Sequence, residues 1–110
     1  MQQVIYRVSG ANRQKFLQGQ LTQDVGLLSS QRSLLAGYCD PKGRLLTPLL
    51  LAIHNDEWLL LLPADNDADI IKRLQMFVMR ADVQFTLAND LHCQIVNHQS
   101  SEPRWSSEPI

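Results

Sequence analysis

A chain of 110 residues, 45% of them hydrophobic and 19% charged, has the length and composition of one globular domain. A domain of this size buries a real core but has little stability to spare. The net charge of -1 conceals an asymmetry, because residues 1–50 hold six Lys or Arg against two acids while residues 51–110 hold four against nine. A basic half suits an anionic ligand; the alternative is a dipolar soluble surface without a ligand.

Cysteine usage and the apolar runs exclude several classes of protein. Cys39 and Cys93 are too few for a disulfide scaffold and stand at no metal-binding spacing. No basic and apolar leader opens the chain, and the longest apolar run, residues 45–53, is far shorter than the ~20 residues of a membrane span. We therefore expect a cytoplasmic protein with reduced thiols and no membrane partner.

The first elements in the chain are a strand and a helix. Residues 4–8 are β-branched and aromatic, which predicts a strand. A helix is predicted over residues 11–18, capped by Ser9 and closed by Gly19 in a left-handed conformation. Residues 20–31 are polar and irregular, and their few apolar side chains are expected to pin a loop to the core.

A meander of three strands follows. Residues 33–40 and 44–53 are apolar and of strand length, and the Asp-Pro-Lys-Gly sequence between them is typical of a tight hairpin turn. A second turn at residues 54–57 leads into a third strand, residues 58–62.

The clearest helix comes next. Three acids crowd its start, and apolar side chains recur at helical spacing after them: Asp65, Asp67 and Asp69, then Ile70, Ile71, Leu74, Phe77 and Val78. Short strands are predicted over residues 83–87 and 91–96, and residues 97–110 have the composition of a flexible tail. The order of elements predicts an α+β fold, a largely antiparallel sheet with two helices, in a domain of residues 1–96.

Two segments carry a resemblance to a known family. Residues 16–25 read Phe-Leu-Gln-Gly-Gln-Leu-Thr-Gln-Asp-Val, and residues 39–44 read Cys-Asp-Pro-Lys-Gly-Arg. Together they resemble the amino-terminal part of the YgfZ/GcvT-type folate-binding family. The pattern is closer to the YgfZ branch, which serves iron–sulfur protein maintenance and tRNA modification, than to the aminomethyltransferase of the glycine cleavage system.

The resemblance covers residues 4–96 and implies one half of a duplicated folate-binding domain. The branch's Lys-Gly-Cys-Tyr-x-Gly-Gln-Glu signature is absent, so the sequence is interpreted as an amino-terminal fragment. By resemblance, the expected cofactor is tetrahydrofolate or a derivative, and the expected partners include iron–sulfur client proteins. A missing second half would leave a sheet edge and apolar surface exposed, which favours self-association.

The hairpin turn holds the most suggestive cluster of side chains. The Asp40 carboxylate suits the N–H donors of a pterin, Lys42 and Arg44 suit glutamate carboxylates, and Gly43 permits close approach of the backbone. The alternative is a hairpin turn with solvated charges.

Polar side chains after the first helix are a second candidate. Gln20 and Asp24, with Gln18 and Thr22, could line a polar pocket, although Asp24 could equally hold the local backbone. Cofactor-binding residues are therefore predicted to be Asp40, Lys42, Gly43, Arg44, Gln20 and Asp24.

The sequence does not favour catalysis. Thr47 and Pro48 stand where the aminomethyltransferase carries an aspartate pair, so we expect no aminomethyltransferase activity. The three histidines are dispersed without ligand or triad spacing, Cys39 is expected to be a buried thiol, and no basic and aromatic groove favours nucleic acid. The rival function is a non-catalytic protein-interaction or RNA-contacting module that keeps the half-fold without binding folate.

Overall fold

The computed structural model describes residues 3–95 and 103–106, with side chains for residues 3–91. Strands, two α-helices and one 3-10 turn follow one another along these residues: β1 Gln3–Ser9, α1 Arg13–Gln20, η1 Val25–Leu27, β2 Leu34–Cys39, β3 Leu45–His54, β4 Glu57–Pro63, α2 Asp67–Val78, β5 Gln84–Leu87, β6 His92–Ile95 and β7 Pro103–Ser106. Neither helix in this part of the chain is long and apolar enough to cross a membrane.

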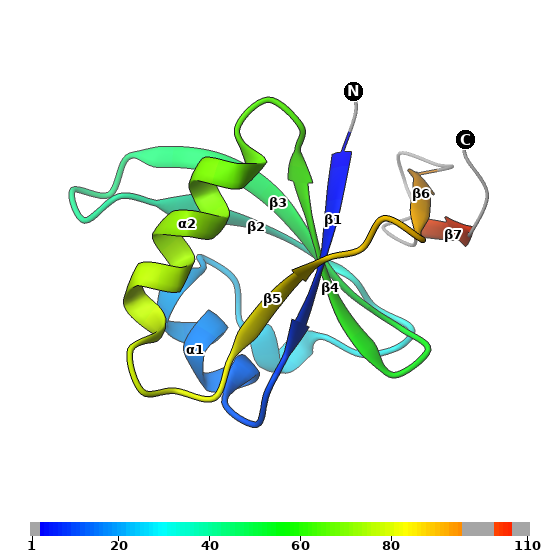
Figure 1. Ribbon diagram of the computed structural model, residues 1–110, viewed down its shortest axis with the longest axis horizontal. Coiled ribbons are helices and arrows are strands. Elements are labelled where there is room, and N and C mark those ends of the chain that lie inside the picture. The colour runs from blue at the N-terminus through cyan, green and yellow to red at the C-terminus, as the bar shows by residue number, and fades with distance from the viewer. Residues whose placement is uncertain (1–2, 96–102, 107–110) are drawn as a thin grey trace.

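The centre of the fold is a five-stranded sheet in the order β2-β3-β4-β1-β5, in which every neighbouring pair is antiparallel (Figure 1). The first strand of the chain, β1, lies inside the sheet between β4 and β5. The meander β2-β3-β4 confirms the predicted three strands. The α+β class with an antiparallel sheet and two helices is thus confirmed.

A β-bulge interrupts the hairpin between β2 and β3. Tyr38 pairs with Thr47 and Cys39 pairs with Leu45, so Leu46 is an extra residue on β3. An extra residue bends its strand and redirects the neighbouring side chains. The bulge lies directly next to the predicted turn.

Both helices cover one face of the sheet. The core on this side joins helix residues to strand residues in one cluster of buried side chains: Tyr6, Val8, Leu17, Leu21, Val25, Ala36, Tyr38, Leu49, Leu51, Leu60, Leu62, Ile70, Ile71, Leu74 and Val83. Leu17 and Leu74 anchor α1 and α2 to the sheet, and neither side chain is exposed to solvent. Burying a leucine side chain contributes about 1.5–3 kcal/mol.

The prediction for α2 is correct except at its end. Asp67 and Asp69 stand in the first turn, where negative charge complements the helix dipole, and the buried positions recur at helical spacing. Phe77 was expected to face inward but is 52% exposed. The last turn of α2 overhangs a cavity beside the hairpin, so Phe77 lines that cavity and not the core.

The prediction for α1 is displaced by two residues, and both predicted caps are wrong. Ser9 is the last residue of β1, and Asn12 precedes the helix without a capping hydrogen bond from its side chain. Gly19 is helical, and the helix stops at Leu21, which is extended because it forms a β-bridge with Tyr38. A contact between distant segments therefore ends this helix.

Hydrogen bonds join the residues that precede α1 to Asp82, which precedes β5, and we call this connection the Asp82 strap. The Asp82 carbonyl accepts from the Asn12 amide at 3.0 Å, and the Asp82 carboxylate accepts from the Ala11 amide at 2.9 Å. Gly10, with φ +109°, lies so close that a Cβ there would be 2.1 Å from the Asp82 carbonyl oxygen. Glycine is required at this position by both its dihedral angle and the close approach.

The other face of the sheet carries a second, smaller cluster of buried side chains: Ile5, Leu50, Leu59, Leu61 and Ala88, with Leu91 packed against them. Towards the β2 edge this face is open, since Leu35 is 67% exposed and Leu45 is 62% exposed. The resemblance to one half of a duplicated domain predicted exposed apolar surface, and Leu35 and Leu45 provide such a surface. Self-association through it stays a prediction.

β6 and β7 form a separate antiparallel pair. Residues 103–106 are therefore a strand, where the sequence suggested a flexible tail without regular structure over 97–110. The backbone of this polar segment finds a partner strand that periodicity alone does not reveal. The predicted domain boundary at 96 and 97 and the rest of the tail lie outside the described residues.

Arg7 joins three parts of the sheet. From β1, its Nη atoms donate to both oxygens of Asp90 at 2.8 Å, and its Nε donates to Glu57 at the start of β4. Hydrogen bonding from Arg7 is the main cause that lowers the pKa of Asp90 to about 2, and the same pair raises the pKa of Arg7.

This ion pair predicts a dependence of stability on pH. The pKa of Asp90 is depressed in the folded state, so its contribution is complete above the unfolded pKa of about 3.9 and is lost as pH falls towards 2. Urea unfolding of the parent chain and of Asp90→Asn should differ at pH 7 and converge near pH 2. A constant difference across that range would contradict the assignment.

Candidate functional site

The carboxylate of Asp40 organises the hairpin turn. Its Oδ1 accepts from the backbone amides of Lys42 and Arg44, and its Oδ2 accepts from Arg44 Nε, each at 2.9 Å. These bonds, led by the Arg44 amide, lower the pKa of Asp40. Gly43 closes the turn with φ +84°. The turn is confirmed, but the hydrogen bonds that Asp40 was expected to offer a ligand are largely made within the turn.

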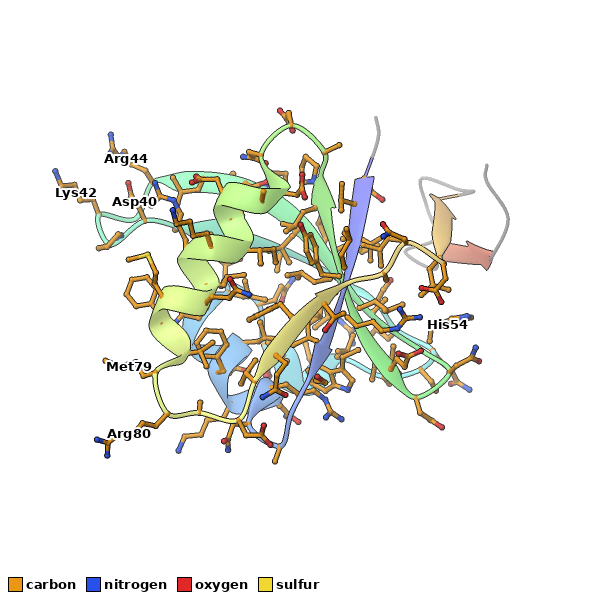
Figure 2. All side chains as sticks on the ribbon, viewed as in Figure 1. Asp40, Lys42, Arg44, His54, Met79 and Arg80 are labelled. Carbon is orange, nitrogen blue, oxygen red and sulfur yellow. The ribbon has the colours of Figure 1, made fainter. Side chains whose placement is uncertain are left out.

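The two cations of the turn do not converge on a pocket. Figure 2 shows the side chains of Lys42 and Arg44 projecting outward from the tip of the hairpin. The Arg44 side chain is 77% exposed although its Nε binds Asp40. Neither residue lines either of the cavities described below.

The polar residues after α1 mostly tie down their own loop. Asp24 accepts from the Gly26 amide at 3.0 Å and begins η1, which is the structural alternative for this residue. Gln18 accepts from the Val25 amide at 2.8 Å, and Thr22 Oγ1 accepts from the Gly37 amide at 2.9 Å. Of the predicted pair, Gln20 alone reaches a cavity.

A cavity of about 480 Å³ lies between the hairpin and α2, and we call it the hairpin cavity. Residues from α1, β2, the turn, β3 and α2 line it: Gly19, Gln20, Tyr38, Cys39, Asp40, Pro41, Leu46, Arg73, Met76 and Phe77. It brings together two predicted site residues, Gln20 and Asp40. Arg73 was not predicted, although its spacing to Met76 and Phe77 places the three on one face of α2.

A second cavity, of about 540 Å³, lies where β4 leads into α2, and we call it the helix-start cavity. It is lined by Leu46, Thr47, Pro48, Pro63, Ala64, Asp65 and Asn66. The bulged residue Leu46 lines both cavities. They therefore adjoin one another along the same side of the hairpin.

The helix-start cavity offers a hydrogen-bond acceptor that lacks a partner. Asn66 Oδ1 is buried and accepts no hydrogen bond in the described part of the chain, and its side chain does not cap α2. Thr47, 2% exposed, donates to the Pro48 carbonyl at 2.9 Å. A buried unpaired acceptor costs about 1–3 kcal/mol, and because Oδ1 is closed off from solvent a ligand N–H would relieve that cost only after the Asn66 side chain turns towards the cavity.

The neighbouring carboxylate of Asp67 is already engaged. Tyr6 donates to Asp67 at 2.6 Å, and burial together with this bond raises the pKa of Tyr6 to about 12. Tyr6 thus acts as a core residue. It also fixes the first turn of α2 beside Asn66.

Neither cavity contains a catalytic arrangement. The described residues hold no cluster of three or more His, Cys, Asp or Glu at metal-binding distances. His54 lies in β3, while the His92 side chain and the whole of His98 lie outside the described residues. Apolar walls with a few polar groups are typical of small-molecule binding sites.

Comparisons with known proteins bear on this site. No protein-family model matches the sequence. The chain is 47% identical over 47 residues to the tRNA-modifying protein YgfZ of Hamiltonella defensa, which is 43% of this chain and 14% of that protein. It is 32% identical over 84 residues to the tRNA-modifying protein YgfZ of Colwellia psychrerythraea, which is 76% of this chain and 26% of that protein. An uncharacterized protein of Haemophilus influenzae is 33% identical over 84 residues, which is 76% of this chain and 30% of that protein.

A solved structure has the same fold. Aminomethyltransferase T of the glycine cleavage system from Bartonella henselae superposes with a TM-score of 0.71 at 20% identity, over 78% of this chain and 24% of that one. The chain is similar to YgfZ proteins over part of their length and shares the fold of an aminomethyltransferase. The resemblance in the two segments is thus confirmed, and the aligned part spans between 14% and 30% of the curated relatives.

The YgfZ/GcvT-type hairpin gives a testable role for Asp40. Asp40→Ala should speed hydrogen exchange at the Lys42 and Arg44 amides, because both donate to its carboxylate. Lys42→Ala, which removes only an exposed side chain, is the matched control and should leave that protection intact. Equal exchange in the two variants would show that the carboxylate does not hold the turn.

Proposed function

We propose that this chain supplies the ring-binding part of a reduced-folate site in a protein of the YgfZ type. The observation that carries the proposal is the helix-start cavity, whose wall includes Asn66, a residue whose buried Oδ1 has no partner in the described part of the chain. A pterin ring carries N–H donors on one edge, and one of them would satisfy this acceptor once the Asn66 side chain turns towards the cavity. The apolar side chains of Pro48 and Pro63 suit the flat faces of the ring.

The relatives add support of a different kind. Two curated relatives are named tRNA-modifying protein YgfZ, and the similar solved structure is an aminomethyltransferase. We extend the proposal to the whole protein as a tetrahydrofolate-binding factor in tRNA modification, and by family resemblance in iron–sulfur protein assembly or repair. Its partners would then include iron–sulfur client proteins.

Removal of the acceptor tests the ring-binding proposal. Asn66→Ala should weaken tetrahydrofolate binding by about 1–3 kcal/mol, the contribution expected of a hydrogen bond lost from a buried partner. Isothermal titration calorimetry measures this difference. Asn66→Asp keeps an acceptor, so it separates the effect of hydrogen bonding from that of side-chain shape. Asn89→Ala removes an exposed amide side chain and is the control for folding.

Unchanged affinity in Asn66→Ala, or no binding by the parent chain, would refute the ring site. Either result would favour the rival function. A non-catalytic module that contacts protein or RNA would leave tetrahydrofolate unbound while the fold is intact.

The proposed site binds without catalysing aminomethyl transfer. Thr47 is buried in the wall of the cavity and Pro48 follows it, so the positions that resemblance assigns to an aspartate pair offer no carboxylate. We therefore expect the chain to form no methylene-tetrahydrofolate from an aminomethylated carrier protein. Product detected by mass spectrometry above the level of a carrier-only control would contradict this expectation.

A further inference from the structure

Tyr38, which lines the hairpin cavity, has a hydroxyl with no role in the fold. The residue as a whole is 4% exposed, and its hydroxyl makes no hydrogen bond within the described residues and is not among the buried unpaired atoms of that part of the chain, so solvent reaches it. A tyrosine hydroxyl that solvent can reach is free to donate to a ligand. The ring packs in the core, and the hydroxyl belongs to a side chain that lines the cavity.

Arg73 supplies a positive charge beside this hydroxyl. Its Nε makes one long contact, 3.3 Å, to Asp69 on the same helix, and both side chains are about half exposed or more. That single i,i+4 contact engages only one of the five guanidinium N–H groups. Arg73 also lies close enough to act on the pKa values of both Tyr38 and Asp40, although burial dominates for Tyr38 and the turn amides dominate for Asp40.

The one carboxylate in the cavity does not cancel this charge. Asp40 is held by two backbone amides and by Arg44, and its charge is directed into the turn. Arg73 and Tyr38 both line the cavity, and both have donors that the fold does not use. A guanidinium and a hydroxyl are groups that bind a carboxylate. Met76 and Phe77 add an apolar lip where an aromatic ring can pack.

We propose that Tyr38 and Arg73 form a carboxylate-binding subsite, and that the hairpin cavity takes the carboxylated aromatic end of the ligand whose ring occupies the helix-start cavity. The two cavities share the wall residue Leu46, and in this proposal one elongated ligand passes over Leu46 and occupies both. This inference rests on the proposed function. It moves the anion-binding role from Lys42 and Arg44, at the tip of the turn, to residues inside the cavity.

Half-ligands separate the two assignments. p-Aminobenzoyl-glutamate carries the aromatic ring and carboxylates without the pterin, and 6-methyl-tetrahydropterin carries the pterin without the carboxylates. Each is titrated calorimetrically into the parent chain, Arg73→Gln, Tyr38→Phe and Arg80→Gln. Arg80→Gln is the control, because it removes an equal charge from a side chain that points away from the cavity (Figure 2).

Arg73→Gln should weaken p-aminobenzoyl-glutamate binding by about tenfold or more, and Tyr38→Phe by about threefold, since each loses a donor to the carboxylate. The thermal midpoint of Tyr38→Phe should match the parent, because no hydrogen bond is lost in the fold. Tetrahydropterin affinity should be unchanged in all variants, and Arg80→Gln should bind both probes normally.

The failures are distinguishable. Tetrahydropterin binding without p-aminobenzoyl-glutamate binding, or equal losses in Arg73→Gln and Arg80→Gln, would overturn the carboxylate subsite and leave the ring site in place. Binding of p-aminobenzoyl-glutamate that depends on Arg73, without tetrahydropterin binding, would support the subsite and overturn the ring site. Binding of neither probe would overturn both.

Discussion

The bulge at Leu46 is the constraint on which the rest of this site depends. One extra residue in β3 separates the pair Tyr38 and Thr47 from the pair Cys39 and Leu45. Without that residue, the side chains near the turn would swap faces, because a shift of one residue reverses the alternation of a strand. With it, Leu46 stands between two cavities, Tyr38 lines one of them and Thr47 lines the other.

In the proposed site, the two cavities divide the chemistry of one ligand between them. The wall of the helix-start cavity includes Asn66, whose Oδ1 is an unused acceptor in the described residues, and the wall of the hairpin cavity includes the donors of Arg73 and Tyr38. A ligand with N–H donors at one end and carboxylates at the other would match this polarity in a single orientation. Specificity then comes from the order of the groups along the groove as well as from their identity.

Local sequence predicted the parts of the fold that local forces determine. The hairpin at Asp40 to Gly43 and the helix with acids at its start follow from turn chemistry and from helical periodicity, and both are present. The predicted end of α1 at Gly19 failed because a tertiary bridge from Leu21 to Tyr38 ends the helix. In the last turn of α2, Val78 packs against the core while Phe77 lines a cavity, a distinction that periodicity does not reveal.

The same distinction applies to the site. Of the residues that the sequence put forward, Asp40 and Gln20 line a cavity. The sequence did not put forward Arg73 or Asn66, because what distinguishes them is what they lack among the described residues: a strong partner for the guanidinium and a partner for Oδ1. Missing partners are visible only in three dimensions. Lys42 and Arg44 project outward from the turn, which their charge in the sequence does not reveal.

The interior position of β1 has a consequence for the order of assembly. β1 is made first, yet its partners, residues 57–63 and 84–87, are made last among the strands of this sheet. The hairpin and its bulge, by contrast, close over a short loop and need little sequence beyond themselves. During synthesis the hairpin side of the sheet can therefore form early, while β1 gains its partners only after the later strands are made and the Asp82 strap has formed.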